Sequence, residues 1–288
     1  MSEALFQLRR GSTPLLISLP HVGTQIPAGM QADFVAGALR VDDTDWHLES
    51  LYDFAAELGA SALAARHSRY VIDLNRSPFD APMYAGQNNT GLCPTRSFGG
   101  EALYRSGREP DAREIERRRE VYWRPYHEAL AAELQRLRAA HGHALLLDGH
   151  SIRSHLPWLF EGKLPDLNLG TAGGQSCAPG LRAALGEVLA GAAQYPPHFT
   201  HAVDGRFRGG YITRHYGQPA LGVHAVQLEM CWSCYMREEP PYAIDEARAL
   251  FVRPVLRELA ATMLAWGAQY DPAIDAGAPP PAGTDHGG

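Results

Sequence analysis

A continuous apolar run that leads directly into ionisable residues is the feature that most limits the fold of this chain. Residues 144–154 read ALLLDGHSIRS, so an apolar run directly precedes Asp148 and His150. A short run of this kind is typical of a strand that is buried on both faces of a parallel sheet. Residues that follow such strands lie at the open edge of an α/β sheet, where ligands usually bind. His150 is therefore a candidate site residue by its position.

Further apolar runs end in residues of reactive type. They are PLLISL (14–19) before His21, RYVIDL (69–74) before Asn75 and Arg76, and VHAVQLEM (223–230), which is closed by Glu229. Strands of one sheet bring such ends together, however far apart they lie in the sequence, so we expect these side chains to converge. Each residue also has a structural interpretation, because a histidine can cap a strand, Glu229 can be an acceptor there, and Arg76 can pair with a nearby aspartate.

Segments with helical periodicity separate these runs. The helical segments expected from the pattern are 42–60, where Asp43 or Thr44 can act as the N-cap, 111–142, which Pro125 kinks or splits, 178–192 and 243–266. Alternating strands and helices of these lengths are typical of one α/β domain with a mostly parallel or mixed sheet. We expect this domain to span residues 1–270 and the Pro/Gly-rich tail 271–288 to be disordered.

Composition excludes several classes of protein. The 288 residues carry a net charge of −6 with 26 basic residues, which argues against a nucleic-acid binder. No apolar run approaches the ~18 residues of a membrane span, and the N-terminus has no signal-peptide pattern. Four cysteines do not indicate a disulfide framework, so we expect a cytoplasmic protein.

The residues at the strand ends suit a metal-dependent hydrolase that acts on an anionic substrate. A catalytic zinc ion takes three protein ligands from histidine and carboxylate side chains and keeps one position open. A carboxylate can then act as the general base towards the attacking water. An arginine beside an asparagine can hold a substrate carboxylate through charge-assisted hydrogen bonds. Zn²⁺ is the expected ion, although Co²⁺ or Mn²⁺ can occupy the same ligand set.

At these residues the sequence resembles the N-formylglutamate amidohydrolase (deformylase) family. The resemblance covers residues 5–266 and is carried by SLPHVGTQIP, DTDWH, SRYVIDLNRSP, DGHSIRSH, FRGGYITRHYG and VQLEMCW, in this order. It implies hydrolysis of N-formyl-L-glutamate to formate and L-glutamate, the last step of one histidine-degradation route. The family is part of a zinc-carboxypeptidase-like group that includes aspartoacylase. Membership implies a single-domain, three-layer αβα fold.

The resemblance also implies roles for individual residues. His21 and His150 match the two histidine metal ligands of the wider group, and Glu229 matches its catalytic glutamate. DLNR matches the Asn-Arg pair that holds a substrate carboxylate, which here is Asn75 and Arg76.

The third metal ligand departs from the pattern of the wider group. Its first motif is His-x-x-Glu, whereas this chain has threonine at position 24 in place of the glutamate. We assign the third ligand to Asp45, at the start of the next expected helix, where a carboxylate suits the helix dipole. Asp43 and His47 are the competing candidates.

The second carboxylate of N-formylglutamate requires another cation. We select Arg214 in TRHYG, with His215 beside it, and Arg206 or Arg208 in GRFRGG as alternatives. Gly209 and Gly210 allow this segment to form a hairpin or a mobile flap, although turn geometry also explains them.

Two other functions remain open from the sequence. The chain can be a deacylase or carboxypeptidase for another N-acylated acidic amino acid. It can also be a non-catalytic amino-acid-binding module that has lost the metal, because the glutamate of the His-x-x-Glu motif is absent. In every case the expected partner is a small molecule, and neither nucleic acid nor a membrane is expected. The oligomeric state is not predicted.

Overall fold

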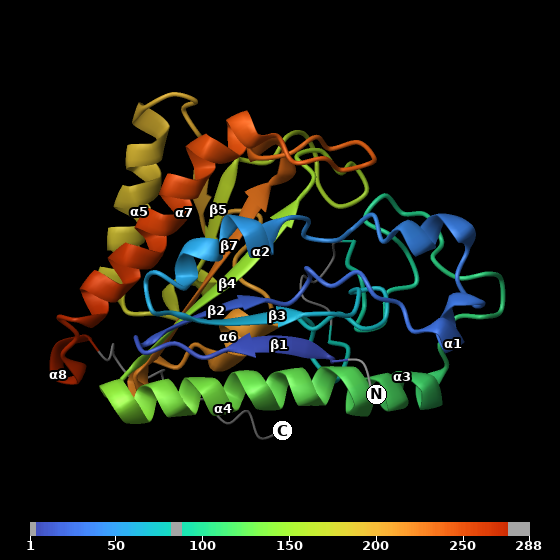
Figure 1. The fold of residues 1–288 in the computed structure, drawn as a ribbon, viewed down its shortest axis with the longest axis horizontal. Coiled ribbons are helices and arrows are strands. Elements are labelled where there is room, and N and C mark those ends of the chain that lie inside the picture. The colour runs from blue at the N-terminus through green and yellow to red at the C-terminus, as the bar shows by residue number, and fades with distance from the viewer. Residues whose placement is uncertain (1–3, 82–87, 276–288) are drawn as a thin grey trace, which may run out of the picture.

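A mixed β-sheet runs through the centre of the molecule in the computed structural model, which describes residues 4–81 and 88–275 (Figure 1). Within these residues the sheet has seven strands in the order β1-β3-β2-β4-β7-β5-β6. The strands are β1 (Phe6–Arg9), β2 (Leu15–Leu19), β3 (Ser61–Ala65), β4 (Ala144–Ile152), β5 (Leu167–Gly170), β6 (His201–Val203) and β7 (Val223–Cys231).

The four central strands, β3, β2, β4 and β7, are parallel to one another. At the edges β1 is antiparallel to β3, β5 is antiparallel to β7, and β6 is parallel to β5. The expected mixed, mostly parallel sheet is therefore confirmed. Because the central strands are parallel, their carboxyl ends all lie at one edge of the sheet.

Helices cover both faces of the sheet. The helices are α1 (Ala28–Gln31), α2 (Leu48–Leu51), α3 (Ala112–Arg118), α4 (Arg124–His141), α5 (Pro179–Gln194), α6 (Tyr211–Tyr216), α7 (Glu246–Gly267) and α8 (Pro272–Asp275). Short 3-10 helices occupy Ala36–Arg40, Asp53–Ala55, Ala172–Gly174, Pro219–Leu221 and Trp232–Cys234. Helices α4 and α6 pack on one face, and α2, α5 and α7 lie on the other (Figure 1). The expected three-layer αβα arrangement is thus confirmed.

The alternation of side chains along β4 shows why the sequence supports two helical layers. Leu145 and Leu147 belong to the core beneath α5 and α7, whereas Ala144 and Leu146 belong to the core beneath α4. All four residues are fully buried or nearly so. A strand buried on both faces requires an unbroken apolar run, which is the pattern that the sequence shows.

Two expected elements differ from the structure. The expected helix over 42–60 is reduced to the single turn α2 and a 3-10 turn. His47, directly before α2, has a left-handed backbone with φ +63°, so the helix does not extend back to Asp43, which accepts a hydrogen bond from Phe98 N. The expected strand over 69–74 is wrong. That segment is irregular, and its apolar residues are buried because they pack in the core beneath α4.

The expected interruption at Pro125 is confirmed. Helices α3 and α4 are joined by a π-turn, Arg119–Trp123, which ends directly before the first residues of α4. Proline has no N–H to donate to the carbonyl four residues earlier, so the regular ladder cannot continue through it. The chain passes this position through a π-turn and remains helical, giving the long helical rod along the bottom of Figure 1.

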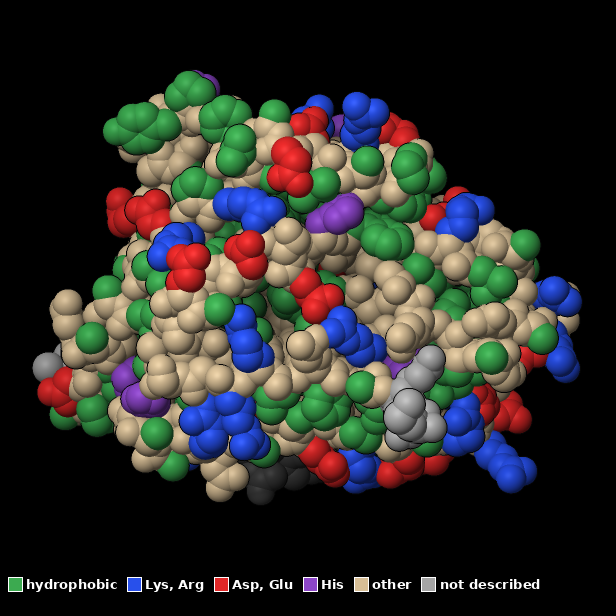
Figure 2. Space-filling model, in the orientation of Figure 1, with side chains coloured by type: hydrophobic (Ala, Val, Ile, Leu, Met, Phe, Trp, Pro, Cys, Tyr) green, Lys and Arg blue, Asp and Glu red, His purple; other side chains and the backbone are tan. Residues whose placement is uncertain are grey.

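The C-terminal segment contains one short helix. Residues 272–275 of the expected disordered tail form α8, and residues 276–288 lie outside the described part. Among the described helices, none has the length and apolar character needed to cross a membrane. Acidic and basic side chains are interspersed over the face shown in Figure 2, in keeping with the small net charge.

A buried histidine ties α4 to the irregular segment that follows β3. His127 is 4% exposed, and its Nε2 donates to the carbonyl oxygen of Leu74 at 2.9 Å. Burial lowers the pKa of this imidazole to about 3. The folded protein therefore holds His127 neutral at every pH above that value.

This burial predicts a loss of stability in acid. Below pH ~6.5 the unfolded chain binds the His127 proton and the folded chain does not, so stability falls by up to about 1.4 kcal/mol per pH unit. Relative to His127→Gln, the wild-type free energy of unfolding should fall by about 2 kcal/mol between pH 7 and pH 5. Urea unfolding of both proteins at the two pH values measures this difference. Parallel pH profiles would contradict the buried, neutral state.

Candidate active site

The carboxyl ends of β2, β4 and β7 bring the expected site residues together. His21 follows β2 by two positions, and Glu229 lies near the end of β7. His150 lies within β4, which continues past it, and its Cα pairs directly with that of Glu229 on the neighbouring strand. Paired residues of adjacent strands point to the same face of a sheet, so this register places the imidazole and the carboxylate side by side.

Two histidines and one carboxylate form a compact cluster. His21, Asp45 and His150 each offer a ligand atom within 4.8 Å of the others, and all three are buried. The Nδ1 atoms of His21 and His150 lie 3.7 and 3.2 Å from Oδ2 of Asp45. The two imidazole ring centres are 4.8 Å apart. Both rings thus turn the same nitrogen towards a shared carboxylate oxygen.

The opposite nitrogen of each imidazole is held by a second carboxylate. Nε2 of His21 donates to Asp73 at 2.8 Å, and Nε2 of His150 donates to Asp148 at 2.9 Å. Metal-binding histidines commonly donate their other N–H to a carboxylate, which fixes the tautomer and leaves the first nitrogen available as a ligand. The arrangement at both rings is that of metal ligands.

Polar atoms left without partners support the same interpretation. Among the described residues, Nδ1 of His21 and Oδ1 of Asp45 are buried and have no hydrogen-bond partner. Buried polar atoms in native proteins are nearly always satisfied, so two such atoms in one cluster need an explanation. A divalent cation held by His21, Asp45 and His150 would satisfy them, and the donor set fits such an ion.

Charges in the cluster are strongly perturbed. Burial opposes ionisation of Asp45, but hydrogen bonds with His150 and His21 lower its pKa to about 2. Burial also opposes a charge on His150, yet Asp148 and Asp45 raise the pKa of this imidazole well above its ordinary value. Both shifts arise because Asp45 and the two imidazoles are buried against one another.

Glu229 differs from the other carboxylates of the site because it forms no ion pair with any described residue. It is 7% exposed and accepts a weak hydrogen bond from Gln227 Nε2 at 3.4 Å. Burial raises its pKa to about 8, and the charges of Asp45 and Asp148 add to this effect while His150 opposes it. A carboxylate with a pKa near neutrality is suited to general acid–base work.

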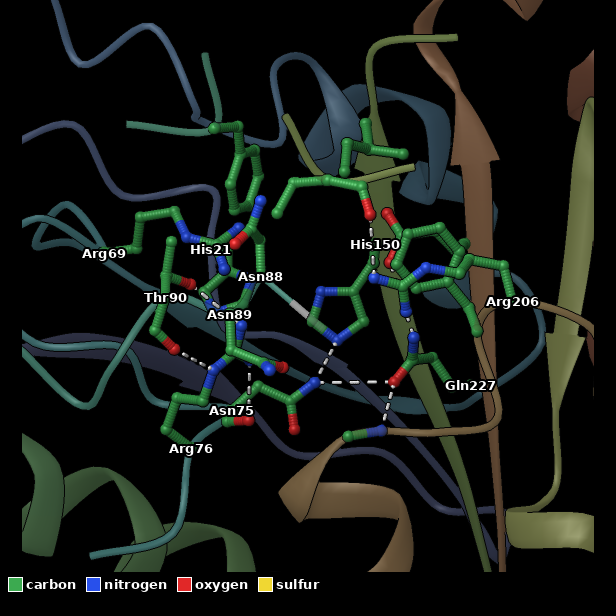
Figure 3. Close-up of a pocket in the computed structure, with 16 residues that line it drawn as sticks. His21, Arg69, Asn75, Arg76, Asn88, Asn89, Thr90, His150, Arg206 and Gln227 are labelled. Atoms are coloured by element: carbon green, nitrogen blue, oxygen red, sulfur yellow. Dashed lines mark hydrogen bonds between the residues drawn. The ribbon is translucent and has the colours of Figure 1, made fainter. Parts of the chain in front are cut away.

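A cavity of about 60 Å³ opens beside the cluster. It is lined by His21, His150 and Glu229, by three arginines, Arg69, Arg76 and Arg206, and by apolar residues that include Phe98 and Phe207. Arg69 and Arg76 lie on one side of His150, and Arg206 lies on the other (Figure 3). The cavity therefore presents positive charge on two sides of the metal-ligand candidates.

Arg76 and Asn75 both line this cavity, as the sequence predicted. The Arg76 guanidinium donates to Thr90 through Nε and Nη2, and its Nη1 lies 3.7 Å from Asp73. Arg69 makes the closer contact with Asp73, at 2.6 Å. The Asn75 amide is held on both sides, because Oδ1 accepts from Ile212 N and Nδ2 faces Asp148.

Arg214 is not brought together with the other predicted residues. It lies on the exposed side of α6, donates to the carbonyl oxygen of Gly209, and does not line the cavity. The expected hairpin is this helix. Gly209 has φ +105°, and a Cβ on Gly210 would lie 2.3 Å from Asn75 Nδ2, so backbone geometry and close packing explain both glycines.

The competing ligands for the third position are engaged elsewhere. Asp43 accepts from Phe98 N, and His47 hydrogen-bonds to the carbonyl oxygen of Tyr242. Asp73 and Asp148 were not among the predicted site residues. The signal for Asp148 is its spacing of two from His150, which places both side chains on one face of β4.

Comparisons with known proteins identify the family of this chain. The N-formylglutamate amidohydrolase profile matches residues 13–236. The chain is 52% identical to N-formylglutamate deformylase of Pseudomonas aeruginosa and 49% identical to that of Pseudomonas putida, covering 93% of this chain and 98% of each relative.

Solved structures give the same result. A crystal structure of N-formylglutamate amidohydrolase from Ralstonia eutropha JMP134 superposes with a TM-score of 0.75 at 25% identity, covering 93% of this chain and 98% of that one. A second structure, from Agrobacterium tumefaciens, has a TM-score of 0.67 at 16% identity, covers 93% of this chain and 97% of that one, and shares the fold. The chain belongs to the N-formylglutamate amidohydrolase family.

Proposed function

We propose that this protein hydrolyses N-formyl-L-glutamate to formate and L-glutamate with the help of one divalent metal ion. The observation that carries the proposal is the His21–Asp45–His150 cluster with Glu229 beside it, in a cavity lined by arginines. The relatives named as deformylases at about half identity over nearly their full length support the same substrate.

His21, Asp45 and His150 would hold the ion. Two imidazoles and one carboxylate form a common ligand set of catalytic zinc sites, so we assign Zn²⁺, with Co²⁺ or Mn²⁺ as ions that the same set accepts. When bound, such an ion lowers the pKa of water and polarises a carbonyl oxygen. Asp73 and Asp148 keep the two imidazoles in the ligating tautomer.

Glu229 is the general base in this proposal. It takes a proton from the attacking water as the oxygen bonds to the formyl carbon. It then delivers that proton to the amide nitrogen as the C–N bond breaks, so that glutamate leaves as the amine. Positive charge at the ligand cluster favours the carboxylate form of Glu229, whose pKa burial otherwise raises. Arg69, buried at the same wall, supplies positive charge for the developing oxyanion.

The two carboxylates of the substrate require two cationic positions. We assign one to Arg76, whose guanidinium is oriented by Thr90. We assign the other to Arg206, which lies across the cavity from Arg76 (Figure 3). Arg206 replaces Arg214 in this assignment, because Arg214 does not reach the cavity wall.

The substrate indicates the pathway of the enzyme, and the cysteines indicate its compartment. N-formylglutamate is an intermediate of histidine breakdown, so we place the enzyme in that pathway. All four cysteines are free and buried, which fits a cytoplasmic protein. The substrate is a small molecule, and we propose no role for nucleic acid or a membrane.

Formate release tests the function directly. Purified protein should release formate from N-formyl-L-glutamate, lose this activity after dialysis against a chelator, and regain it with Zn²⁺. N-acetyl- and N-succinyl-glutamate should be poorer substrates, because the cavity is small. Comparable turnover of the larger acyl groups would favour a broader deacylase, and absence of bound metal would favour a binding module.

Glu229→Gln tests the general base. The substitution keeps the shape of the side chain and removes its proton acceptor, so kcat should fall by about 10²–10⁴-fold. Metal content, measured by elemental analysis, should remain that of the wild type. Glu187→Gln, at an exposed position of α5, is the matched control. A kcat within two-fold of wild type in Glu229→Gln would remove this residue from the mechanism.

Arg206→Gln, compared with Arg214→Gln, tests the second carboxylate position. Loss of a charge-assisted hydrogen bond should raise KM for N-formylglutamate by about 10–100-fold in Arg206→Gln, and Arg214→Gln should stay near wild type. N-formylglutamine lacks the side-chain charge and shows which carboxylate Arg206 holds. A far smaller effect of Arg206→Gln on this compound assigns Arg206 to the side-chain carboxylate, and an equal effect assigns it to the α-carboxylate. A raised KM in Arg214→Gln with a near-normal KM in Arg206→Gln would assign the second carboxylate to Arg214.

A further inference from the structure

We propose that Trp123 and His127, which lie outside the cavity, are positioning residues for the Asn75–Arg76 segment and thereby set the affinity for substrate. This inference rests on the proposed function, because it concerns the arginine assigned to a substrate carboxylate. Neither residue lines the cavity or contacts the metal-ligand cluster. Their effect on the reaction is exerted through the backbone that carries Arg76.

The two side chains hold the carbonyl groups on either side of Asn75. His127 Nε2 donates to the carbonyl oxygen of Leu74 at 2.9 Å, and Trp123 Nε1 donates to that of Arg76 at 3.1 Å. The segment belongs to no strand or helix, so no backbone ladder fixes it. Buried backbone carbonyls require donors, and here side chains of a neighbouring helix supply them.

The donors are themselves rigid. The rings of Trp123 and His127 stack with centroids 3.6 Å apart and planes inclined by 21°. They are four residues apart in the sequence, and such residues are neighbours on a helix surface. Because the two rings are stacked, each limits the movement of the other, and their hydrogen bonds reach carbonyl groups two residues apart in the sequence.

The helix is irregular at this point. The π-turn Arg119–Trp123 ends at Trp123, and Pro125 follows two residues later. Wide turns of this kind occur mostly singly within helices and often at functional sites. Here the π-turn closes on the residue whose indole N–H holds Arg76, which gives the irregularity a role beyond the accommodation of proline.

A third group completes the support. Tyr216 of α6 lies 2.9 Å from Nδ1 of His127, and because Nε2 carries the proton that Leu74 accepts, Nδ1 is the acceptor for the phenol. The first turn of α6 holds the amide of Asn75 through Ile212 N at 2.8 Å. The Asn75–Arg76 segment is therefore hydrogen-bonded from both α4 and α6. The His127 imidazole connects the two helices, because it also contacts Tyr216.

Loss of these hydrogen bonds is expected to affect substrate binding more than the chemical step. Removing the indole N–H leaves the Arg76 carbonyl without that donor and releases one end of the segment. The guanidinium then samples more positions, which weakens its fit to a planar carboxylate. The metal-ligand candidates and Glu229 are carried by other elements. Asn75 Nδ2 does lie 2.9 Å from His150 Nε2, but Ile212 N of α6 holds the Asn75 amide independently of Trp123. We therefore expect the larger effect on substrate binding and a smaller one on turnover.

The test distinguishes the loss of a hydrogen-bond donor from a change in side-chain size. Trp123→Phe keeps a stacking ring and removes the N–H, His127→Phe does the same for the imidazole, and His127→Gln restores an amide N–H near the position of Nε2. Trp266→Phe in α7 is the matched control, since Trp266 lies against His224 and Tyr270, away from the site.

We expect KM for N-formylglutamate to rise about ten-fold in Trp123→Phe and in His127→Phe, below the ~10²-fold that a full 1 Å misplacement can cause. In both, kcat and zinc content should stay within two-fold of wild type, and His127→Gln should recover most of the affinity. Binding of L-glutamate, measured by calorimetry, should weaken in parallel with KM. The double variant should lose less than the sum of the two effects, because both act on one segment.

Three outcomes would overturn the positioning role. They are an unchanged KM in Trp123→Phe, a fall in kcat that matches the change in KM, or an equal effect in Trp266→Phe. If His127→Phe does not fold, Trp123→Phe decides alone. The wild type is assayed in the same experiment, so a wild type that releases no formate refutes the proposed function, and an active wild type with an unaltered Trp123→Phe refutes only the positioning.

Discussion

The burial of His21, Asp45 and His150 at one sheet edge is the constraint on which the rest of the site depends. Desolvation of ionisable groups costs several kcal/mol per charge unless partners compensate. Here the cost is offset by successive hydrogen bonds. Asp73 and Asp148 accept from Nε2 of His21 and of His150, and Arg69 in turn donates to Asp73. Three further buried carboxylates, Asp73, Asp148 and Glu229, nevertheless surround the cluster. Negative charge gathered in this way is what a divalent ion would neutralise.

The surrounding structure fixes each member of the cluster by contacts distant in sequence. Asp45 N donates to the carbonyl oxygen of His21, and the Tyr235 hydroxyl donates to the carbonyl oxygen of the residue after Asp45. Asp148 also accepts from Ser18 of the adjacent strand at 3.0 Å. Rigid strands and a buried phenol thus hold the ligand atoms, which is how precise constellations are maintained.

These contacts explain how far the sequence could predict the site. His150 and Glu229 follow from apolar runs, because parallel strands must end at one edge. The run 69–74 carries the same signal but forms no strand, since burial under α4 produces the same composition without a ladder partner. Asp45 was assigned from its place at the start of an expected helix, of which only the single turn α2 and a 3-10 turn are present. The contacts that hold this segment join residues up to 189 positions apart, beyond any local pattern.

The substrate side of the cavity is built on a different principle. Strands carry His150 and Glu229, whereas irregular segments carry Arg76 and Arg206, and periodicity contains no information about where such side chains point. Arg214 was selected within a segment that we expected to form a hairpin or flap. The segment is instead the helix α6, in which Ile212 and Thr213 take the buried side and leave Arg214 exposed. A segment without a ladder can place a guanidinium only if other groups hold its backbone. The geometry of substrate binding therefore depends on the helices that hold the Asn75–Arg76 segment as much as on Arg76 itself.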